Sequence, residues 1–157
     1  MLTDVEISIF PVVWRSVLAA MIGLAVGWER YASGSPVRAR ILALVGLTST
    51  ALTAISFQLP ISDPARIPAS LLTGVGFIGA GVVMHDGKGR VRGLTTAASL
   101  WAVTGIAIAI GAGLVSIGLL LSLVVYFFIS WDEWPFLTRL RKQQVNQNTK
   151  DDQKESI

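Results

Sequence analysis

The sequence predicts an all-α, polytopic membrane protein: a bundle of about five transmembrane helices. Hydrophobic residues make up 52% of the 157 residues and charged residues only 15%, a composition too apolar for an ordinary soluble domain. The apolar residues also come in continuous runs of about 18–20 residues. A helix needs that length to cross a hydrocarbon core of roughly 30 Å.

The apolar runs place the helices in order along the chain, at about 7–28, 41–59, 67–84, 94–112 and 113–131. The first run is short unless it extends toward the N-terminus and carries Arg15 within it. A cleaved signal peptide is the competing interpretation, but Asp4 and Glu6 stand where such a peptide has basic residues. We therefore expect the first helix to be retained.

Basic residues lie almost entirely on one side of the predicted membrane. Of the thirteen Lys and Arg residues, all but Arg15 and Arg66 lie next to the first-to-second connection, in the third-to-fourth connection, or after the fifth helix. The positive-inside rule assigns that side to the cytoplasm. We expect a transmembrane domain over 1–134 with its N-terminus outside, and a polar, disordered cytoplasmic tail over 135–157. The net charge of +3 needs no nucleic-acid partner, because anionic lipid headgroups are its expected counter-charge.

The third helix contains the sequence GVGFIGAG over 74–81, and its first six residues match the G-x-G-x-x-G spacing of dinucleotide-binding loops. No strand precedes it and no acidic residue follows about twenty positions later, so we expect no dinucleotide. On a helix, Gly74 and Gly81 fall on one side and Gly76 and Gly79 on nearly the opposite side. Small residues mark contact faces between membrane helices. We therefore expect a central helix wedged between neighbours, with a helix broken at a ligand site as the alternative.

The first helix repeats the packing signal with Gly23-x-x-x-Gly27. Its one internal charge, Arg15, is expensive inside a membrane and is a functional candidate on that ground. It also lies only about two turns from the outer end of the helix, so its side chain can equally extend outward to the interface.

The same helix ends in Glu29 and Arg30. A carboxylate near a helix C-terminus opposes the helix dipole and gains from a nearby cation, for which Arg38 and Arg40 are the candidates. An interfacial ion pair is one interpretation. A buried polar cluster, or a ligand for a divalent cation, is the other.

A candidate functional cluster lies on the predicted cytoplasmic side. Its members are Glu29, Arg30, Arg38, Arg40, Asp86, Arg90, Arg92, Thr95 and Thr96. Thr95 or Thr96 can cap the fourth helix, and a helix N-terminus favours an anion. The segment 85–93 is therefore either a phosphate or lipid-headgroup site or a plain connection.

Magnesium is the metal ion that this cluster suggests, because Mg²⁺ takes hard oxygen ligands. Glu29 and Asp86 are the candidate magnesium ligands, and no cofactor is required. On the outer side we expect Asp63 and Arg66 to form a local ion pair across a proline turn. The sequence has no cysteine, a single histidine and no nucleophile–histidine–acid set, so we expect no enzymatic activity.

Several stretches together resemble the MgtC/SapB family of bacterial inner-membrane proteins. They are GLAVGWER (23–30), the basic start of the second helix (38–40), DPARI (63–67), TGVGFIGAGVVM (73–84) and VRGLTTAASLWAVTGIAIAIGAG (91–113). The resemblance covers roughly residues 17–115, in the order of the family. It implies as motif positions Glu29, Arg30, Arg38, Asp63, Arg66, the Gly74–Gly81 run, Arg92, Gly93, Thr95, Thr96 and Trp101.

The resemblance also implies a role in magnesium homeostasis and growth at low magnesium, a location in the bacterial cytoplasmic (inner) membrane and, in pathogens, a part in virulence. Family members are further expected to act on other membrane proteins, including the ATP synthase and transport ATPases. Two departures limit what carries over: VRARI stands where the family often has a GLRTH-like segment, and the tail over 135–157 is too short for the soluble ACT-like domain of many members.

Three functions follow from the sequence. The first is association through helix packing, with a second copy (a dimer is favoured) or with another membrane protein. The second is a magnesium transporter or channel, with Glu29 and Asp86 at the inner mouth and Asp63 at the outer mouth. Its polar path would consist of hydroxyls: Thr48, Ser49, Thr50, Thr53, Thr73, Ser99 and Thr104. The third is a lipid-headgroup-binding regulator that uses Arg38, Arg40, Arg90 and Arg92.

Overall fold

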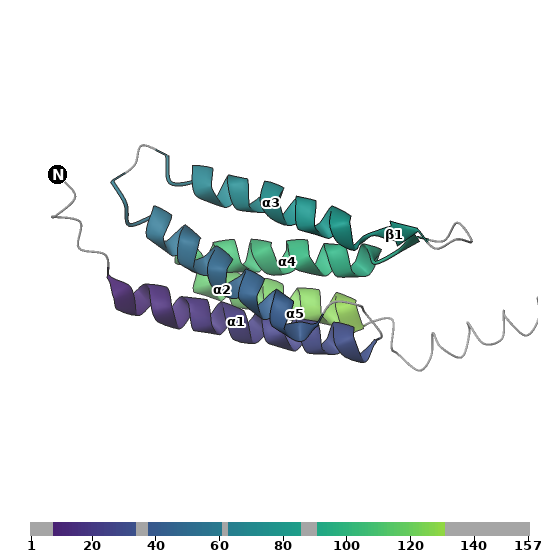
Figure 1. The fold of residues 1–157 in the computed structure, drawn as a ribbon. Helices are drawn as coiled ribbons and strands as arrows, with labels where there is room; N and C mark the ends of the chain where they lie inside the picture. Colours follow the sequence, from purple (N-terminus) through teal and green to yellow (C-terminus); the bar gives the residue numbers. More distant parts are fainter. Residues whose placement is uncertain (1–7, 34–37, 61–62, 86–90, 131–157) are drawn as a thin grey trace, which may run out of the picture.

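The computed structural model of the chain describes residues 8–33, 38–60, 63–85 and 91–130. Its helices are α1 (Ile9–Ala32), α2 (Ala39–Ser56), α3 (Arg66–Val82), α4 (Leu94–Gly111) and α5 (Val115–Ser130), which run side by side along one direction (Figure 1). A two-residue strand pair, β1 (Met84–His85) and β2 (Val91–Arg92), connects α3 to α4. The predicted all-α fold with five helices is confirmed. The strand pair is an addition that the sequence did not predict.

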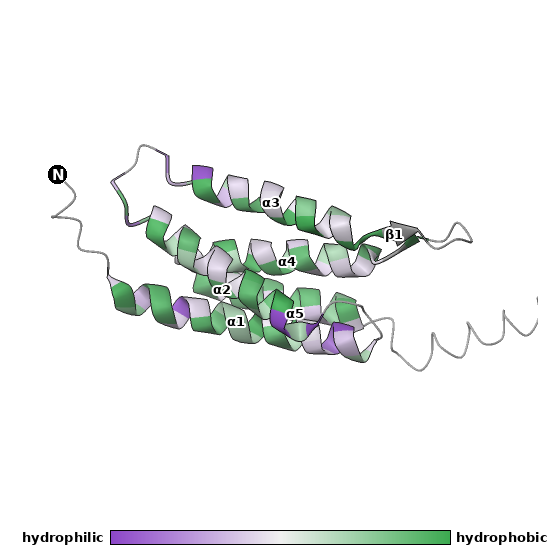
Figure 2. Ribbon diagram, in the orientation of Figure 1, coloured by the Kyte–Doolittle hydropathy of each residue, from purple (hydrophilic) through white to green (hydrophobic). Residues whose placement is uncertain are grey.

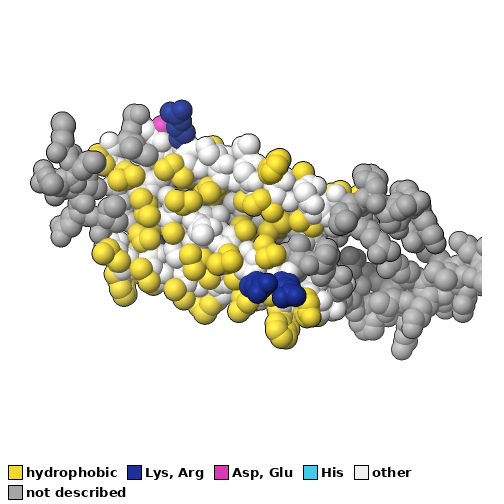
Figure 3. All heavy atoms as spheres, viewed as in Figure 1, with side chains coloured by type: hydrophobic (Ala, Val, Ile, Leu, Met, Phe, Trp, Pro, Cys, Tyr) yellow, Lys and Arg dark blue, Asp and Glu magenta, His cyan; other side chains and the backbone are white. Residues whose placement is uncertain are grey.

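The described helices have the length and surface of membrane helices. Three of them, α1, α2 and α4, are long and apolar enough to cross a membrane, and α3 and α5 are apolar but slightly shorter. Hydrophobic residues run along all five helices (Figure 2), and hydrophobic side chains cover much of the visible surface (Figure 3). Exposed aromatic side chains lie near both ends of α1, Phe10 and Trp14 at one end and Trp28 and Tyr31 at the other, as in the aromatic belts of membrane proteins.

The central helix is α4, which packs against each of the other four helices. Its buried side chains include Leu100, Val103, Ala107 and Ile110, all at most 1% exposed. The expectation that the third helix is central is wrong: α3 lies at the edge and packs mainly on α4 (Figure 1). The broken-helix alternative is wrong as well, because α3 is one continuous helix.

Small residues bring α1 and α2 into backbone contact. Along α1, Ala19, Gly23 and Gly27 are spaced four apart and face α2. A Cβ added at Gly27 would lie 2.6 Å from the Cα of Ala39, and one added at Gly23 would lie 2.8 Å from the carbonyl carbon of Leu42. Neither position has room for a side chain, so this close antiparallel pairing depends on the two glycines.

The connection from α4 to α5 is a tight turn at Gly113. Gly113 has φ +94°, and its N–H donates to the carbonyl of Ile110 at 3.1 Å while the N–H of Leu114 donates to the carbonyl of Ala109 at 2.9 Å. These two bonds form a Schellman motif, which favours glycine at its left-handed position. The motif explains why the sequence places two helices directly after one another with no polar loop between them.

Gly93 begins α4. It occupies the N-cap with φ +87°, and a Cβ there would collide with the carbonyl oxygen of Val82 at the end of α3. The expectation that Thr95 or Thr96 caps this helix is therefore wrong. Glycine stands at the cap because this backbone passes against the end of α3 in a left-handed conformation.

Candidate functional site

The fold sorts the predicted site residues into two groups at opposite ends of the bundle. We call the end where α1, α3 and α5 finish the Glu29 end, and the other the Asp63 end. Residues 29, 30, 38, 40, 92, 95 and 96 lie toward the Glu29 end, whereas residues 15, 63 and 66 lie toward the Asp63 end. This division follows the basic residues, as the sequence predicts. Which end faces the cytoplasm stays a prediction, and the positions predicted at Asp86 and Arg90 lie outside the described residues.

Glu29 and Arg30 form a buried ion pair at the last turns of α1. The Arg30 guanidinium donates from Nε to Glu29 Oε2 and from Nη2 to Glu29 Oε1, both at 2.6 Å. The two residues are only 8% and 6% exposed. Ser33 Oγ also donates to Glu29 Oε1, at 3.1 Å. Of the two open interpretations, the buried polar cluster is the one that the structure contains.

The cation beside Glu29 is its own sequence neighbour. Arg38 and Arg40, the partners expected from the sequence, are both exposed at the start of α2, and that expectation is wrong. Both oxygens of the Glu29 carboxylate are occupied by Arg30, which argues against Glu29 as a magnesium ligand. Among the residues that the structure describes, no group of three or more His, Cys, Asp or Glu side chains lies close enough to hold a metal ion.

Arg30 also joins the first helix to the last one. Its Nη2 donates to the carbonyl oxygen of Ile129 at 2.7 Å, across 99 residues of sequence. Ile129 lies in the final turn of α5, where carbonyl groups lack a partner within their own helix and the dipole favours a cation. The buried Arg30 guanidinium therefore binds the Glu29 carboxylate on one side and the C-terminal end of α5 on the other.

Arg15 makes the corresponding contact at the other end of α1. Its Nη1 donates to the carbonyl oxygen of Gly111 in a long bond of 3.5 Å, at the last residue of α4. The guanidinium carbon lies 5.7 Å from the centre of the Trp14 ring, within range of a cation–π contact. Two arginines of α1, spaced about 22 Å apart along the helix, thus contact the C-termini of α4 and α5.

Buried hydroxyls lie on α2 and α4, and that of Thr50 joins the two helices. Thr50 Oγ1 donates to the carbonyl of Ala107 at 3.0 Å, and Thr104 Oγ1 donates to the carbonyl of Leu100 at 2.9 Å. Both threonines are 0% exposed, whereas Thr48 and Thr73 lie on the outside. The seven hydroxyls proposed as a polar path therefore do not line one channel within a single chain.

Asp63 and Arg66 do not form the expected ion pair. Asp63 Oδ1 accepts a hydrogen bond from the backbone N–H of Ala65 at 3.0 Å. In the part of the chain that the structure describes, the salt bridge between Arg30 and Glu29 is the one recorded. The exposed Arg66 guanidinium is thus not paired with Asp63, three residues away.

The glycines of α3 fall into two kinds. A Cβ added at Gly79 would lie 3.5 Å from the Cβ of Ala97, an ordinary contact with α4. Gly74, Gly76 and Gly81 meet nothing within 4 Å. Within the described part of the chain, no residue therefore packs against these three glycines.

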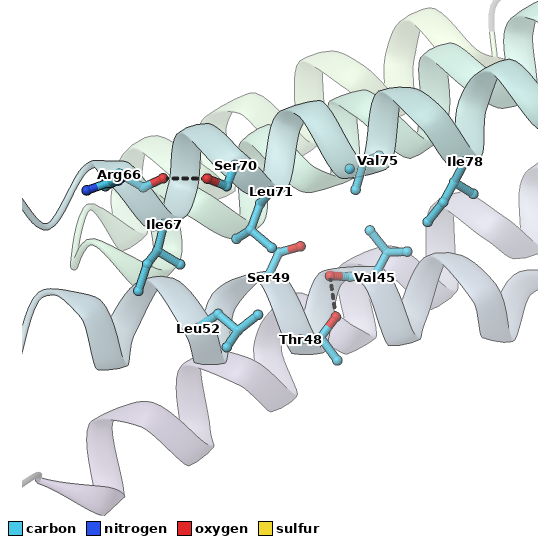
Figure 4. A pocket seen from close by; sticks show the side chains of 11 residues that line it. Val45, Thr48, Ser49, Leu52, Arg66, Ile67, Ser70, Leu71, Val75 and Ile78 are labelled. Atoms are coloured by element: carbon cyan, nitrogen blue, oxygen red, sulfur yellow. Dashed lines mark hydrogen bonds between the residues drawn. The ribbon is translucent and has the colours of Figure 1, made fainter.

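A groove runs between α2 and α3, and Gly74 is the one of these three glycines that lines it (Figure 4). It has a volume of about 620 Å³. Its lining residues are Val45, Thr48, Ser49, Leu52, Arg66, Ile67, Ser70, Leu71, Gly74, Val75 and Ile78. No motif in the sequence predicts this groove, because it depends on the distance between two helices.

Fold and site define a helical integral membrane protein whose helices are held by backbone contacts at glycines and by a buried ion pair. The chain belongs to the MgtC family, whose model matches residues 17–134. Trp101, a motif position of the family, is 55% exposed on α4.

Three curated relatives illustrate the likeness. Protein SapB of Bacillus subtilis is 33% identical over 126 residues, which are 73% of this chain and 54% of the relative. Protein MgtC of Salmonella typhimurium is 36% identical over 104 residues, 66% of this chain and 45% of the relative. The putative magnesium transporter YhiD of Escherichia coli is 37% identical over 114 residues, 67% of this chain and 53% of the relative. The chain thus spans about half the length of the curated relatives it matches. No solved structure matches it significantly.

Proposed function

We propose that this chain is a non-enzymatic protein of the bacterial inner membrane that serves adaptation to low magnesium through helix–helix association. Its partner is a second copy of the chain or another membrane protein. Family membership and the names of the Salmonella and Escherichia coli relatives support the link to magnesium. The mode of action rests on one observation, the outward face of α3.

A row of small residues runs along the exposed side of α3, next to the Phe77 side chain, which is 83% exposed. Ala69, Thr73, Gly76 and Ala80 follow one another at spacings of four, three and four along the helix, and all are exposed. This spacing keeps them on one side of a helix. Small residues let helix backbones approach closely in a membrane, so this face suits a partner helix.

The test places a large side chain on the outward face of α3 without disturbing the contacts within the bundle. Gly76→Leu places a side chain where nothing lies within 4 Å, and Gly105→Leu does the same on α4. We expect Gly76→Leu to weaken association about tenfold, equal to about 1.4 kcal/mol, while Gly105→Leu leaves it unchanged. Crosslinking in native membranes measures association. Growth of a deletion strain at low magnesium, complemented by each variant, measures function. Equal crosslinking and growth with both variants would remove the basis of the proposal.

Magnesium transport is the second candidate, favoured by the name of the Escherichia coli relative. It requires a path that several chains would form together, because Thr48 and Thr73 lie on the outside of one chain whereas Thr50 and Thr104 are buried and donate to backbone carbonyls. Uptake of Mg²⁺ into liposomes that contain the purified protein, driven by a membrane potential, tests it directly. Uptake that Asp63→Asn reduces would support transport, and no uptake would exclude it.

A further inference from the structure

We propose that the groove between α2 and α3 binds one phosphoethanolamine lipid, with an acyl chain along the groove, its phosphate against Arg66 and its ammonium against Asp63. This site is separate from the outward face of α3. It lies toward the Asp63 end, opposite Arg38 and Arg40.

The groove has the shape and chemistry of an acyl-chain site. Leu52 from α2 and Ile67, Leu71 and Ile78 from α3 line it, and Figure 4 shows the two helices facing each other across it. Its volume of about 620 Å³ lies within the roughly 300–1,000 Å³ of small-molecule sites. The hydroxyls of Thr48 and Ser70 donate to the backbone of their own helices, so they add little polarity to the walls.

The length of the groove matches one leaflet of a bilayer. From Arg66 to Ile78 the rise along α3 is about 18 Å, close to half of a hydrocarbon core of roughly 30 Å. A chain that entered at Arg66 would therefore end near the middle of the membrane. Helices of the bundle run in the same direction as the groove (Figure 1), so the chain lies parallel to its neighbours in the leaflet.

The charges at the mouth select the headgroup. Arg66 is the first residue of α3 and the one charged residue among those that line the groove. It is exposed and not paired with Asp63, so it is available to a phosphate, which arginine binds with two parallel hydrogen bonds.

Asp63 makes a zwitterionic headgroup fit better than an anionic one. Its carboxylate is exposed, lies three residues before Arg66 and accepts one hydrogen bond at Oδ1. The phosphate of either headgroup is repelled by this carboxylate, but only the ammonium of ethanolamine is attracted to it, which favours ethanolamine over a headgroup such as glycerol that carries the phosphate charge alone. The pair Arg66 and Asp63 therefore complements the phosphate and the ammonium of one headgroup.

Native mass spectrometry of the full chain tests the proposal, with phosphatidylethanolamine and phosphatidylglycerol of identical acyl chains titrated in turn. We expect one tightly bound phosphatidylethanolamine per chain, and about tenfold weaker binding after Arg66→Gln, the loss typical of hydrogen bonds to a charged group. Asp63→Asn should shift the preference toward phosphatidylglycerol. Equal affinity of the unmodified chain for both lipids, or no effect of Arg66→Gln, would overturn the proposal.

A matched pair of leucine variants tests the groove itself. Gly74 lines the groove and Gly81 does not, and a Cβ at either position meets nothing within 4 Å. Gly74→Leu should abolish the tight binding of either lipid, and Gly81→Leu should leave it unchanged. If Gly74→Leu changes the oligomeric state and leaves lipid binding intact, a second copy occupies the groove and the lipid proposal is wrong.

Crosslinking of the unmodified chain answers the same question without any variant. Vesicles contain phosphatidylethanolamine with a photoactivatable group on its acyl chain, and labelled peptides are mapped after irradiation. We expect labels concentrated on residues 45–52 and 67–78. Labels spread evenly over the outer faces of all helices would show ordinary bilayer contact and contradict a site.

Discussion

Gly23 and Gly76 are both glycines in the middle of apolar helices, yet they occupy opposite environments. A Cβ at Gly23 would collide with the backbone of α2, and a Cβ at Gly76 would meet nothing. The same contrast holds for charge: Arg30 is buried against Glu29 and α5, whereas Arg66 is exposed. The α1 side of the bundle, by which we mean α1 with its contacts to α2, α4 and α5, is closed. The α3 side, with the groove and the outward face of α3, is open to a partner or a lipid.

The largest effect that this comparison predicts comes from the buried charge. Glu29→Gln leaves the Arg30 guanidinium buried without a counter-charge, which costs about 3–5 kcal/mol of unfolding free energy. The matched change on the α3 side, Arg66→Gln, removes an exposed charge and should cost less than about 0.5 kcal/mol. Unfolding in mixed micelles by increasing SDS, followed by circular dichroism, measures both. A small loss for Glu29→Gln would mean that the α1 side is not held by this pair.

A smaller loss is expected at the backbone contact of α1 with α2. Gly23→Ala places a methyl group against the backbone at Leu42, which can yield only if the two helices separate. We expect a loss of about 1–3 kcal/mol, as for other overpacked sites. The same SDS titration gives the value. A fully stable Gly23→Ala variant would show that α1 and α2 can accommodate a methyl group at this contact.

The smallest effect should have the opposite sign. Gly81→Ala adds a methyl group in open space on α3 and replaces a poor helix former with the best one, a gain of up to about 1 kcal/mol. Unfolding of the detergent-purified chain should shift slightly toward higher SDS. A clear loss of stability would indicate that the α3 side is closed by a contact outside the single chain, and would sharpen the search for it.

Much of the fold could be predicted because it depends on local pattern. Apolar runs gave the five helices, including the fourth and fifth directly after one another. The position of α3 could not be predicted in this way. Glycines on two faces of a helix show that close approach is allowed on both, but not whether the neighbour belongs to the same chain.

The site shows the same limit. The sequence indicated that Glu29 needs a cation, yet the expected partners were Arg38 and Arg40. Adjacent residues on a helix do not normally face each other, so helix geometry does not predict Arg30 as the partner of Glu29. Its long side chain reaches back to Glu29 because the carbonyl of Ile129 draws the guanidinium to that side. A contact across 99 residues leaves no local trace in the sequence.

That contact also bears on the order in which the protein is made. Chains are synthesised from the N-terminus, so Arg30 enters the membrane long before Ile129 exists. Until the last helix arrives, the guanidinium has Glu29 but not the end of α5. Arg15 likewise lacks its contact with the carbonyl oxygen of Gly111 until α4 has been synthesised. The first helix to be synthesised is therefore the last to acquire its full set of contacts. In a truncated chain that ends before α5, the Arg30 guanidinium would lack its contact with the end of that helix.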